Sequence, residues 1–236
     1  MQFEELPDLL RPEKLPYLSG MEVLPGCILH VAVLTRMPGV SPKMFSWWFG
    51  EYMQTSEHYR RWHPRDHVWM SWKDKRPGTH LGARHLVHEY IGGKLNKLQI
   101  SFVPPEEFFE DALQGAPDAV AICARVGLLY QPIDIGRMVH LCVPTDWGSE
   151  LHSRFWLGYI HSRSGARIPE AVGNLPPVRR WLARASVGRA LAVHCHEEMT
   201  TLATFLPDLY GAQDPCLAEH EARGGNSPIY LDPAGS

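Results

Sequence analysis

The chain has 236 residues, of which 44% are hydrophobic and 21% charged, and its formal net charge at pH 7 is -3. This size suits one large domain, or one domain with a small appendage. The near-neutral charge, with no block of lysines or arginines, argues against nucleic acid or a membrane surface as the main partner. No apolar run approaches the roughly 20 residues of a membrane span.

The N-terminus and the cysteines indicate the compartment. Residues 1–16 contain acids and prolines but no apolar core segment, so we expect no signal peptide. The five cysteines are odd in number and form no CxxC pair. They are Cys27, Cys123, Cys142, Cys195 and Cys216. This usage favours reduced thiols in a cytoplasmic protein over a disulfide framework.

The first part of the chain predicts an extension, a strand and two helices. Residues 1–40 are rich in proline and are expected to form an N-terminal extension, with one strand in the apolar run 27–34. Ser41 followed by Pro42 is typical of a helix start and opens the first helix. A second short helix is expected over residues 56–62.

Strand patterns occupy the middle of the chain, as apolar or alternating runs bounded by turn residues. These runs are residues 67–72, 81–91, 95–103, 119–125, 138–143 and 150–159. The last two flank a turn over residues 145–148 and are expected to form a hairpin. A short helix is expected between Pro104 and Leu113.

After Ser162 the pattern becomes helical, with one helix starting at Pro176 and a longer one over residues 187–206. Residues 211–236 are expected to form a surface coil. Strands joined by short turns and followed by helices indicate an α+β fold with a mostly antiparallel sheet. A long C-terminal helix across a curved sheet would leave room for a pocket between them.

The long helix carries a polar pair at the centre of an otherwise apolar stripe. Its members follow helical steps on one face: Leu191, His194, Cys195, Glu198, Leu202 and Phe205. A buried carboxylate needs a partner. A His and a Glu four residues apart, such as His194 and Glu198, can present two ligands to one metal ion. The alternative is an ordinary hydrogen bond between the two side chains on a helix surface.

Two further polar clusters can complete a metal site. His63 and His67 are four residues apart, but Pro64 argues against one continuous helix through both. Only one of them is therefore expected to reach a metal. His67 begins a strand and is favoured, while the choice of His63 stays open. Glu89 shares a strand face with apolar neighbours and so needs either a metal or a salt bridge.

Together, His67, Glu89, His194 and Glu198 offer two imidazoles and two carboxylates. A four-coordinate nitrogen and oxygen set suits Zn²⁺, and Fe²⁺ or Mn²⁺ are open alternatives. Cys195 is turned by about 100° from His194 around the helix, so we do not expect it to coordinate.

Several short sequence blocks, in order, carry a resemblance to a known family. They are Tyr59-x-x-Trp62-His63-Pro64-x-Asp66-His67, Glu89-Tyr90-Ile91-Gly92-Gly93, Ser153-Arg154-Phe155-Trp156-Leu157-Gly158, and His194-x-x-x-Glu198-Met199 with Phe205-Leu206-Pro207. In this order and spacing, the blocks resemble the 2,4-diacetylphloroglucinol hydrolase family, which includes phloretin hydrolase. The matching part runs from about residue 45 to residue 210.

The resemblance implies a fold, a cofactor and a reaction. The fold is Bet v 1/START-like, a helix-grip domain over residues 41–210 in which a curved antiparallel sheet wraps a long C-terminal helix. The cofactor is a zinc ion held by His67, Glu89, His194 and Glu198. The reaction is hydrolysis of a carbon–carbon bond between an acyl group and a phenolic ring. The expected partner is thus a small aromatic or polyketide substrate, and a homodimer is the assembly considered.

The resemblance also suggests roles in the pocket. Tyr59 matches a tyrosine that contacts a substrate phenol, and His140 matches a pocket histidine. Both are candidate proton donors to the leaving aromatic carbon, with core packing as the alternative. Other aromatic residues could wall a flat pocket or belong to the core: Trp47, Trp48, Trp69, Trp72 and Phe155. Of these, Trp69 and Phe155 are expected, with Tyr59, to bind the substrate.

Two departures from the family leave the reaction open. Family members carry a substrate-binding tyrosine where this chain has Phe155, and an asparagine expected near Met70 is absent. Zinc-dependent retro-Claisen hydrolysis is the first hypothesis. A metal-dependent tailoring enzyme that cyclises, isomerises or decarboxylates a polyketide is the alternative. A non-enzymatic binder of hydrophobic ligands is the third.

Overall fold

The computed structural model describes residues 1–165, 167–182 and 184–213. Within them, eight strands form one antiparallel sheet with the order β1-β2-β8-β7-β6-β5-β4-β3. The strands are β1 (Gly20–Leu24), β2 (Ile28–Pro38), β3 (His67–Lys73), β4 (Arg84–Ile91), β5 (Lys94–Val103), β6 (Val120–Leu128), β7 (Ile133–Thr145) and β8 (Gly148–Ser162).

Helices connect or cover the strands. The α-helices are α1 (Pro42–Trp47), α2 (Ser56–Trp62), α3 (Glu106–Phe109), α4 (Arg167–Gly173), α5 (Pro176–Leu182) and α6 (Ala185–Gln213). A π-helical turn, η4 (Trp48–Tyr52), continues α1, and 3-10 turns include η1 (Phe3–Leu10) and η5 (Ala112–Gly115). Among the described residues, no helix is long and apolar enough to cross a membrane.

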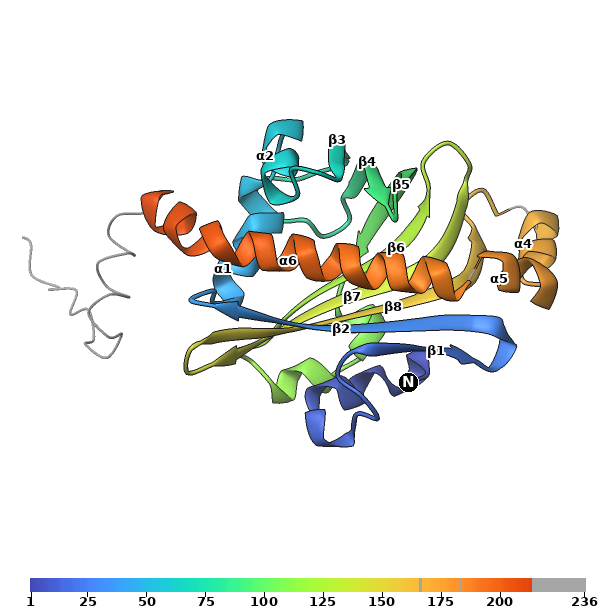
Figure 1. The fold of residues 1–236 in the computed structure, drawn as a ribbon, viewed down its shortest axis with the longest axis horizontal. Helices are drawn as coiled ribbons and strands as arrows, with labels where there is room; N and C mark the ends of the chain where they lie inside the picture. The colour runs from blue at the N-terminus through green and yellow to red at the C-terminus, as the bar shows by residue number, and fades with distance from the viewer. Residues whose placement is uncertain (166, 183, 214–236) are drawn as a thin grey trace, which may run out of the picture.

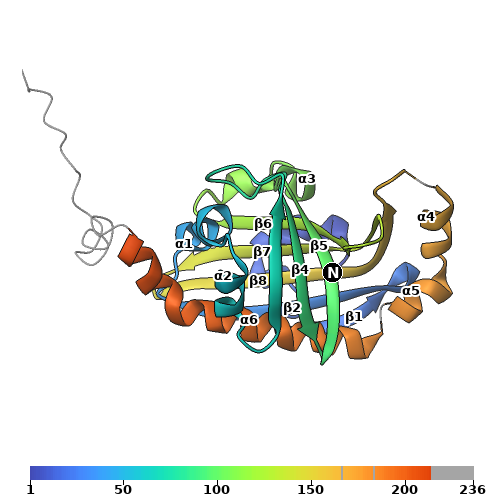
Figure 2. The ribbon, with the colours of Figure 1, turned by 90° about the horizontal axis from the view of Figure 1, so that it is seen from above.

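Helix α6 organises the fold. It runs in orange along the whole length of the sheet in Figure 1, and in Figure 2 the strands curve over it. The stripe identified in the sequence faces the sheet, because this orientation removes its apolar side chains from water. Buried residues of α6 include His194, Cys195, Glu198, Met199, Leu202 and Leu206.

The two faces of the sheet carry separate cores because strand residues alternate between faces. On β8, Phe155 belongs to the core between the sheet and α6, whereas Trp156 belongs to the core on the opposite face. There, Leu6 and Leu9 of η1 lie in one cluster with Phe109 of α3. The N-terminal segment therefore covers the face of the sheet that α6 leaves open.

The predicted α+β, helix-grip architecture is confirmed: a curved antiparallel sheet holds a long C-terminal helix. The six predicted central strands and the strand in 27–34 are present, and Ser41 caps α1 by accepting a hydrogen bond from the Met44 amide at 3.3 Å. Edge strand β1 was not predicted, because Gly20–Leu24 has little alternation of apolar residues.

The expected domain boundaries at residues 40 and 210 stay a prediction. Strands β1 and β2 pair within the same sheet as the other strands, and α6 continues to Gln213. Residues 214–236, with Cys216 and most of the expected coil, lie outside the described residues.

Candidate metal centre

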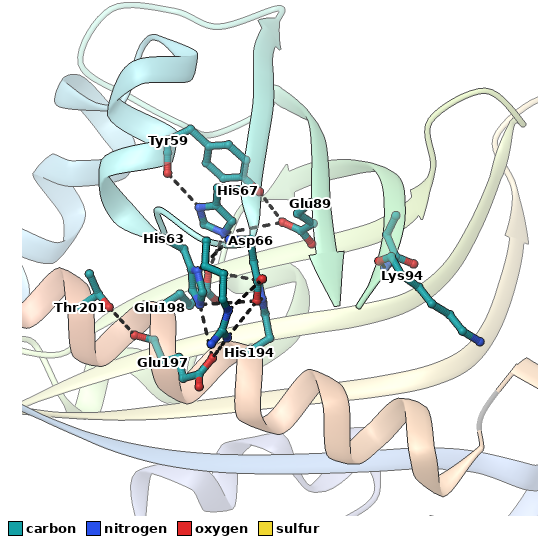
Figure 3. A network of polar contacts seen from close by, with 12 residues as sticks. Tyr59, His63, Asp66, His67, Glu89, Lys94, His194, Glu197, Glu198 and Thr201 are labelled. Atoms are coloured by element: carbon teal, nitrogen blue, oxygen red, sulfur yellow. Dashed lines mark hydrogen bonds and ion pairs between the residues drawn. The ribbon is translucent and has the colours of Figure 1, made fainter. Parts of the chain in front are cut away.

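Four buried polar side chains from three elements meet between the sheet and α6 (Figure 3). His67 and Glu89 are register partners on β3 and β4, while His194 and Glu198 come from successive turns of α6. The Glu198 Oε2 atom lies 3.4 Å from His67 Nε2 and 3.9 Å from His194 Nε2, and Glu89 Oε2 lies 3.9 Å from His67 Nε2. The fold thus brings together the four ligands expected from the sequence.

The donor set fits a divalent metal ion. The His67 Nε2 atom is buried and has no hydrogen-bond partner among the described residues, although it faces both carboxylates. Ligand atoms of His67, Glu89 and His194 all lie within 4.8 Å of one another. In a tetrahedral zinc site with bonds near 2.1 Å, ligand atoms are roughly 3.4 Å apart. The observed spacings are close to this value and need only small side-chain movements.

The electrostatics of the cluster favour a cation. Burial, and then the neighbouring Glu89 carboxylate, raise the pKa of Glu198 to about 8, although His194 opposes the shift. Burial lowers the pKa of His67 to about 4. Burial also acts to lower the pKa of His194, but the Glu198 and Glu89 carboxylates raise it above its ordinary value. A metal ion would relieve the repulsion between two buried carboxylates.

Tyr59 of α2 sets the orientation of His67. Its backbone carbonyl accepts a hydrogen bond from His67 Nδ1 at 2.9 Å, which leaves Nε2 without a proton in the neutral ring. The Tyr59 ring stacks on the imidazole at 3.7 Å and 6°, and its hydroxyl donates to Glu89 Oε2. One residue therefore contacts two of the four candidate ligands.

A second polar cluster supports His194 from its other side. Asp66 Oδ2 lies 3.5 Å from His194 Nδ1, and His63 Nε2 lies 3.8 Å from Asp66 Oδ2 and 3.6 Å from Glu197 Oε2. His63, Asp66 and His194 could also hold a metal ion by distance alone. However, the Arg65 guanidinium already pairs with both Asp66 and Glu197 and supplies positive charge there. His67 is the histidine that faces Glu89 and Glu198.

A cavity of about 300 Å³ opens beside the cluster. Tyr59, Glu89, His194 and Glu198 form part of its lining. Most other lining side chains are apolar, among them Phe49, Trp62, Leu98, Ile100, Phe102 and Leu157. A mainly apolar cavity with a few polar groups gathered in it is typical of a small-molecule site.

His140 and Phe155 lie in this cavity, where the sequence placed them. The Nδ1 atom of His140 lies 2.7 Å from Ser153 Oγ, and burial lowers the pKa of the ring to about 3. The Phe155 ring meets His140 edge-on at 5.7 Å. The position where relatives were expected to carry a tyrosine hydroxyl is therefore apolar here.

The structure does not bring Trp69 into this cavity, and its role in substrate binding stays a prediction. Trp69 is 38% exposed, and its ring lies tilted at 45° against that of His88, outside the cavity lining. A bulge follows His67 on β3, so both His67 and Met70 face inward and Trp69 faces outward. The other tryptophans proposed as pocket walls, Trp47, Trp48 and Trp72, belong to or pack against the core and are absent from the described lining.

Among the lining residues that the sequence did not reveal, Trp62 and His85 carried a positional signal. Trp62 lies three residues after Tyr59 on α2, on the same helix face. His85 lies four residues before Glu89 on β4, on the same strand face. Spacing from a neighbouring site residue would have identified both.

Fold and site together define a helix-grip protein with a buried cluster of two histidines and two glutamates beside an apolar cavity. Residues 1–211 match the family described as DAPG hydrolase PhiG domain, so the chain belongs to this family. The chain is 30% identical over 233 residues to a 2,4-diacetylphloroglucinol hydrolase of Pseudomonas sp, covering 88% of this chain and 75% of that protein. It is 27% identical over 229 residues to phloretin hydrolase of Eubacterium ramulus, covering 89% and 78%.

Solved structures show weaker similarity. Ara h 8.0201 aligns with a TM-score of 0.43 and 9% identity, covering 80% of this chain and 99% of that one. Norcoclaurine synthase from Thalictrum flavum aligns with a TM-score of 0.38 and 12% identity, covering 80% and 96%.

Proposed function

We propose that this chain is a zinc-dependent hydrolase that cleaves the carbon–carbon bond between an acyl group and a polyhydroxylated aromatic ring, a retro-Claisen reaction. One observation carries the proposal: a buried cluster of two histidines and two glutamates lies beside an apolar cavity. The chain's relatives, named as hydrolases of 2,4-diacetylphloroglucinol and phloretin, support this choice of substrate class.

The residues that would hold the metal are His67, Glu89, His194 and Glu198. When bound, zinc would supply a Lewis acid for the acyl carbonyl and would bring the pKa of water from about 15.7 towards 7. Two carboxylate ligands offset much of the metal charge. The reaction would therefore favour an electron-rich ring that helps its own cleavage.

The overall reaction requires the protein to deliver a proton to the ring carbon that leaves. The oxygen of water forms a bond to the acyl carbon, the bond from that carbon to the ring breaks, and the ring carbon takes up a proton. The products are a carboxylic acid and the hydroxylated ring. A hydroxyl next to the acyl group allows a keto tautomer of the ring, which makes the ring carbon a feasible leaving group.

Tyr59 is proposed to bind the substrate and to hold a proton for it. Burial, and then the Glu89 carboxylate, raise the pKa of Tyr59 well above its ordinary value, so the hydroxyl stays protonated. That hydroxyl already donates to Glu89 in the cluster. A phenol oxygen of a bound substrate would replace the Glu89 carboxylate as the acceptor of the hydrogen bond from the Tyr59 hydroxyl.

His140 is proposed as the second group that manages a proton. Burial keeps its ring neutral, with a pKa of about 3, and Ser153 holds Nδ1. A negative charge on the bound ring would raise this pKa, since an opposite charge nearby favours imidazolium. His140 would therefore gain its proton only with the substrate in place, and the apolar walls would exclude competing water.

Metal content and acid release test the proposal together. We expect about one equivalent of zinc per purified chain, and release of a carboxylic acid from acylphloroglucinols or dihydrochalcones. Glu198→Ala should lose the metal and the activity, because it removes a carboxylate from the cluster. His196→Ala is the matched control, since His196 is an exposed neighbour on the same helix. Full metal occupancy in Glu198→Ala would contradict the ligand assignment.

Phe155 favours one alternative, a metal-dependent enzyme that cyclises, isomerises or decarboxylates a polyketide. Phe155 presents an apolar ring to the cavity where a tyrosine hydroxyl was expected. Full metal occupancy without acid release from any acylated phenol in the panel would favour this alternative. Less than about a tenth of an equivalent of any transition metal would instead favour a non-enzymatic binder of hydrophobic ligands.

A further inference from the structure

The cavity contains polar atoms that no protein group satisfies. Among its described lining residues, two have a buried side-chain nitrogen without a hydrogen-bond partner: His85 Nε2 and Trp62 Nε1. A buried polar atom of this kind costs stability, and in a native protein it calls for an explanation. A ligand that fills the cavity would explain these two nitrogens, because it can supply the missing hydrogen-bond partner.

Aromatic neighbours hold the His85 ring in one orientation. The imidazole stacks on Trp72, with centroids 4.6 Å apart and planes at 21°. Trp72 is itself held by a hydrogen bond from Nε1 to the Met53 carbonyl at 2.7 Å. The Tyr59 ring meets His85 edge-on, with the two ring centroids 5.3 Å apart. His85 is thus a fixed polar group in an aromatic wall.

The chemistry of His85 suits a hydroxyl group. His85 is 1% exposed, and burial lowers its pKa to about 3, so the ring is neutral and has one donor and one acceptor nitrogen. A hydroxyl can meet either nitrogen, because it both donates and accepts. A charged ligand group at His85 would lose its hydration without gaining an opposite charge, because the His85 ring is neutral.

We propose that His85 binds a ring hydroxyl of the aromatic substrate and thereby selects rings that carry several hydroxyls. The Tyr59 ring contacts both His67 and His85, so one ring oxygen would lie near Tyr59 and the candidate metal cluster, and a second near His85. The naming of the substrate as a polyhydroxylated ring rests on the proposed function. The hydrogen-bonding role of His85 rests on the geometry of the cavity.

Binding of simple rings tests this role without turnover. Phloroglucinol and phenol, which carry three hydroxyls and one, would be titrated by calorimetry into the metal-loaded protein. We expect the native protein to bind phloroglucinol at least about tenfold more tightly, because a site built for a hydroxyl discriminates against its absence. In His85→Phe, the second hydroxyl has lost its partner, and the two affinities should agree within about threefold.

His88→Phe is the matched control. His88 lies on the same strand but packs against Trp69, outside the described cavity lining, so this variant should keep the native preference. Metal content is measured for each variant and should stay at the native value. A preference that survives in His85→Phe, or a native protein that does not bind phloroglucinol, would overturn the proposal.

A second measurement needs no substitution, in case His85→Phe does not fold. Nitrogen NMR of the native protein should show the His85 ring signals move when phloroglucinol is added. Unmoved His85 signals at saturation would refute the role. The outcomes for the two proposals differ. Failure to release acid from acylated phenols would overturn the hydrolase proposal alone. Absence of a phloroglucinol preference in the native protein would overturn the role of His85 alone.

Discussion

At the scale of single residues, the candidate centre depends on which nitrogen of each histidine is free. The Tyr59 carbonyl accepts a hydrogen bond from Nδ1 of His67, and Asp66 lies beside Nδ1 of His194. In both rings, Nε2 is then directed at the carboxylates of Glu89 and Glu198. Such outer partners fix the tautomer of a metal-binding histidine and increase its basicity.

Asp66→Asn should therefore weaken metal binding while the fold is kept. We expect the zinc affinity to fall by about 10–100-fold, because the amide cannot stabilise the His194 ring as a carboxylate does. Competition with a chromogenic chelator measures this affinity. Asp208→Asn, an exposed position on the same helix as His194, is the control and should bind zinc normally. Equal affinity in both variants would mean that Asp66 has no part in holding the metal ligand.

At the scale of elements, the centre depends on how closely the β4–β5 hairpin approaches α6. Gly92, in the turn, has a φ of 59° and lies so close to the helix that an added Cβ would be 2.7 Å from Ala190 Cβ. Both residues line the cavity. This contact holds β4, and with it Glu89, at a short distance from the helix that carries His194 and Glu198.

Gly92→Ala should destabilise the protein by about 1–3 kcal/mol, through backbone strain at a positive φ and a clash with Ala190. Gly93→Ala separates the two causes, since Gly93 also has a positive φ, of 75°, but no atom near an added Cβ. Urea unfolding of both variants gives the free energies. Equal losses in the two variants would show that the contact with α6 adds nothing.

At the scale of the whole molecule, the interior is rich in histidines that burial keeps neutral. Burial is the largest cause in each case, and the pKa values fall to about 3 or 4. The residues are His30, His67, His80, His85, His140 and His152. The unfolded chain, with ordinary histidine pKa values near 6.5, binds protons below that pH while the folded protein does not.

The folded protein should accordingly lose stability as the pH falls from about 6.5 towards 4. In this window the unfolded state binds more protons than the native state, so the free energy of unfolding rises with pH. Below the pKa values of these histidines in the folded protein, their contribution to the free energy of unfolding is fully lost. We expect the melting temperature at pH 5 to lie at least several degrees below that at pH 7, measured by calorimetry on metal-free protein. A flat melting temperature across this range would contradict the burial of these rings.

Much of the arrangement follows from local sequence patterns, because these patterns act over a few residues. Alternation identified the central strands, helical periodicity identified α6, and Ser41 with Pro42 identified the start of α1. The pair His194 and Glu198 was recognisable as polar residues on a buried helix face. His67 and Glu89, polar residues in otherwise apolar surroundings, completed the candidate set, and the family resemblance then implied zinc there.

Only the tertiary structure decided which side chains share the cavity. The bulge after His67 turns Trp69 outward, and neither composition nor alternation predicts a bulge. Trp62 and His85 both line the cavity because α2, through Tyr59, contacts strand β4 of the curved sheet. The sequence by itself determined the elements and the candidate donor atoms, whereas the sheet curvature and the crossing of α6 determined which of them meet.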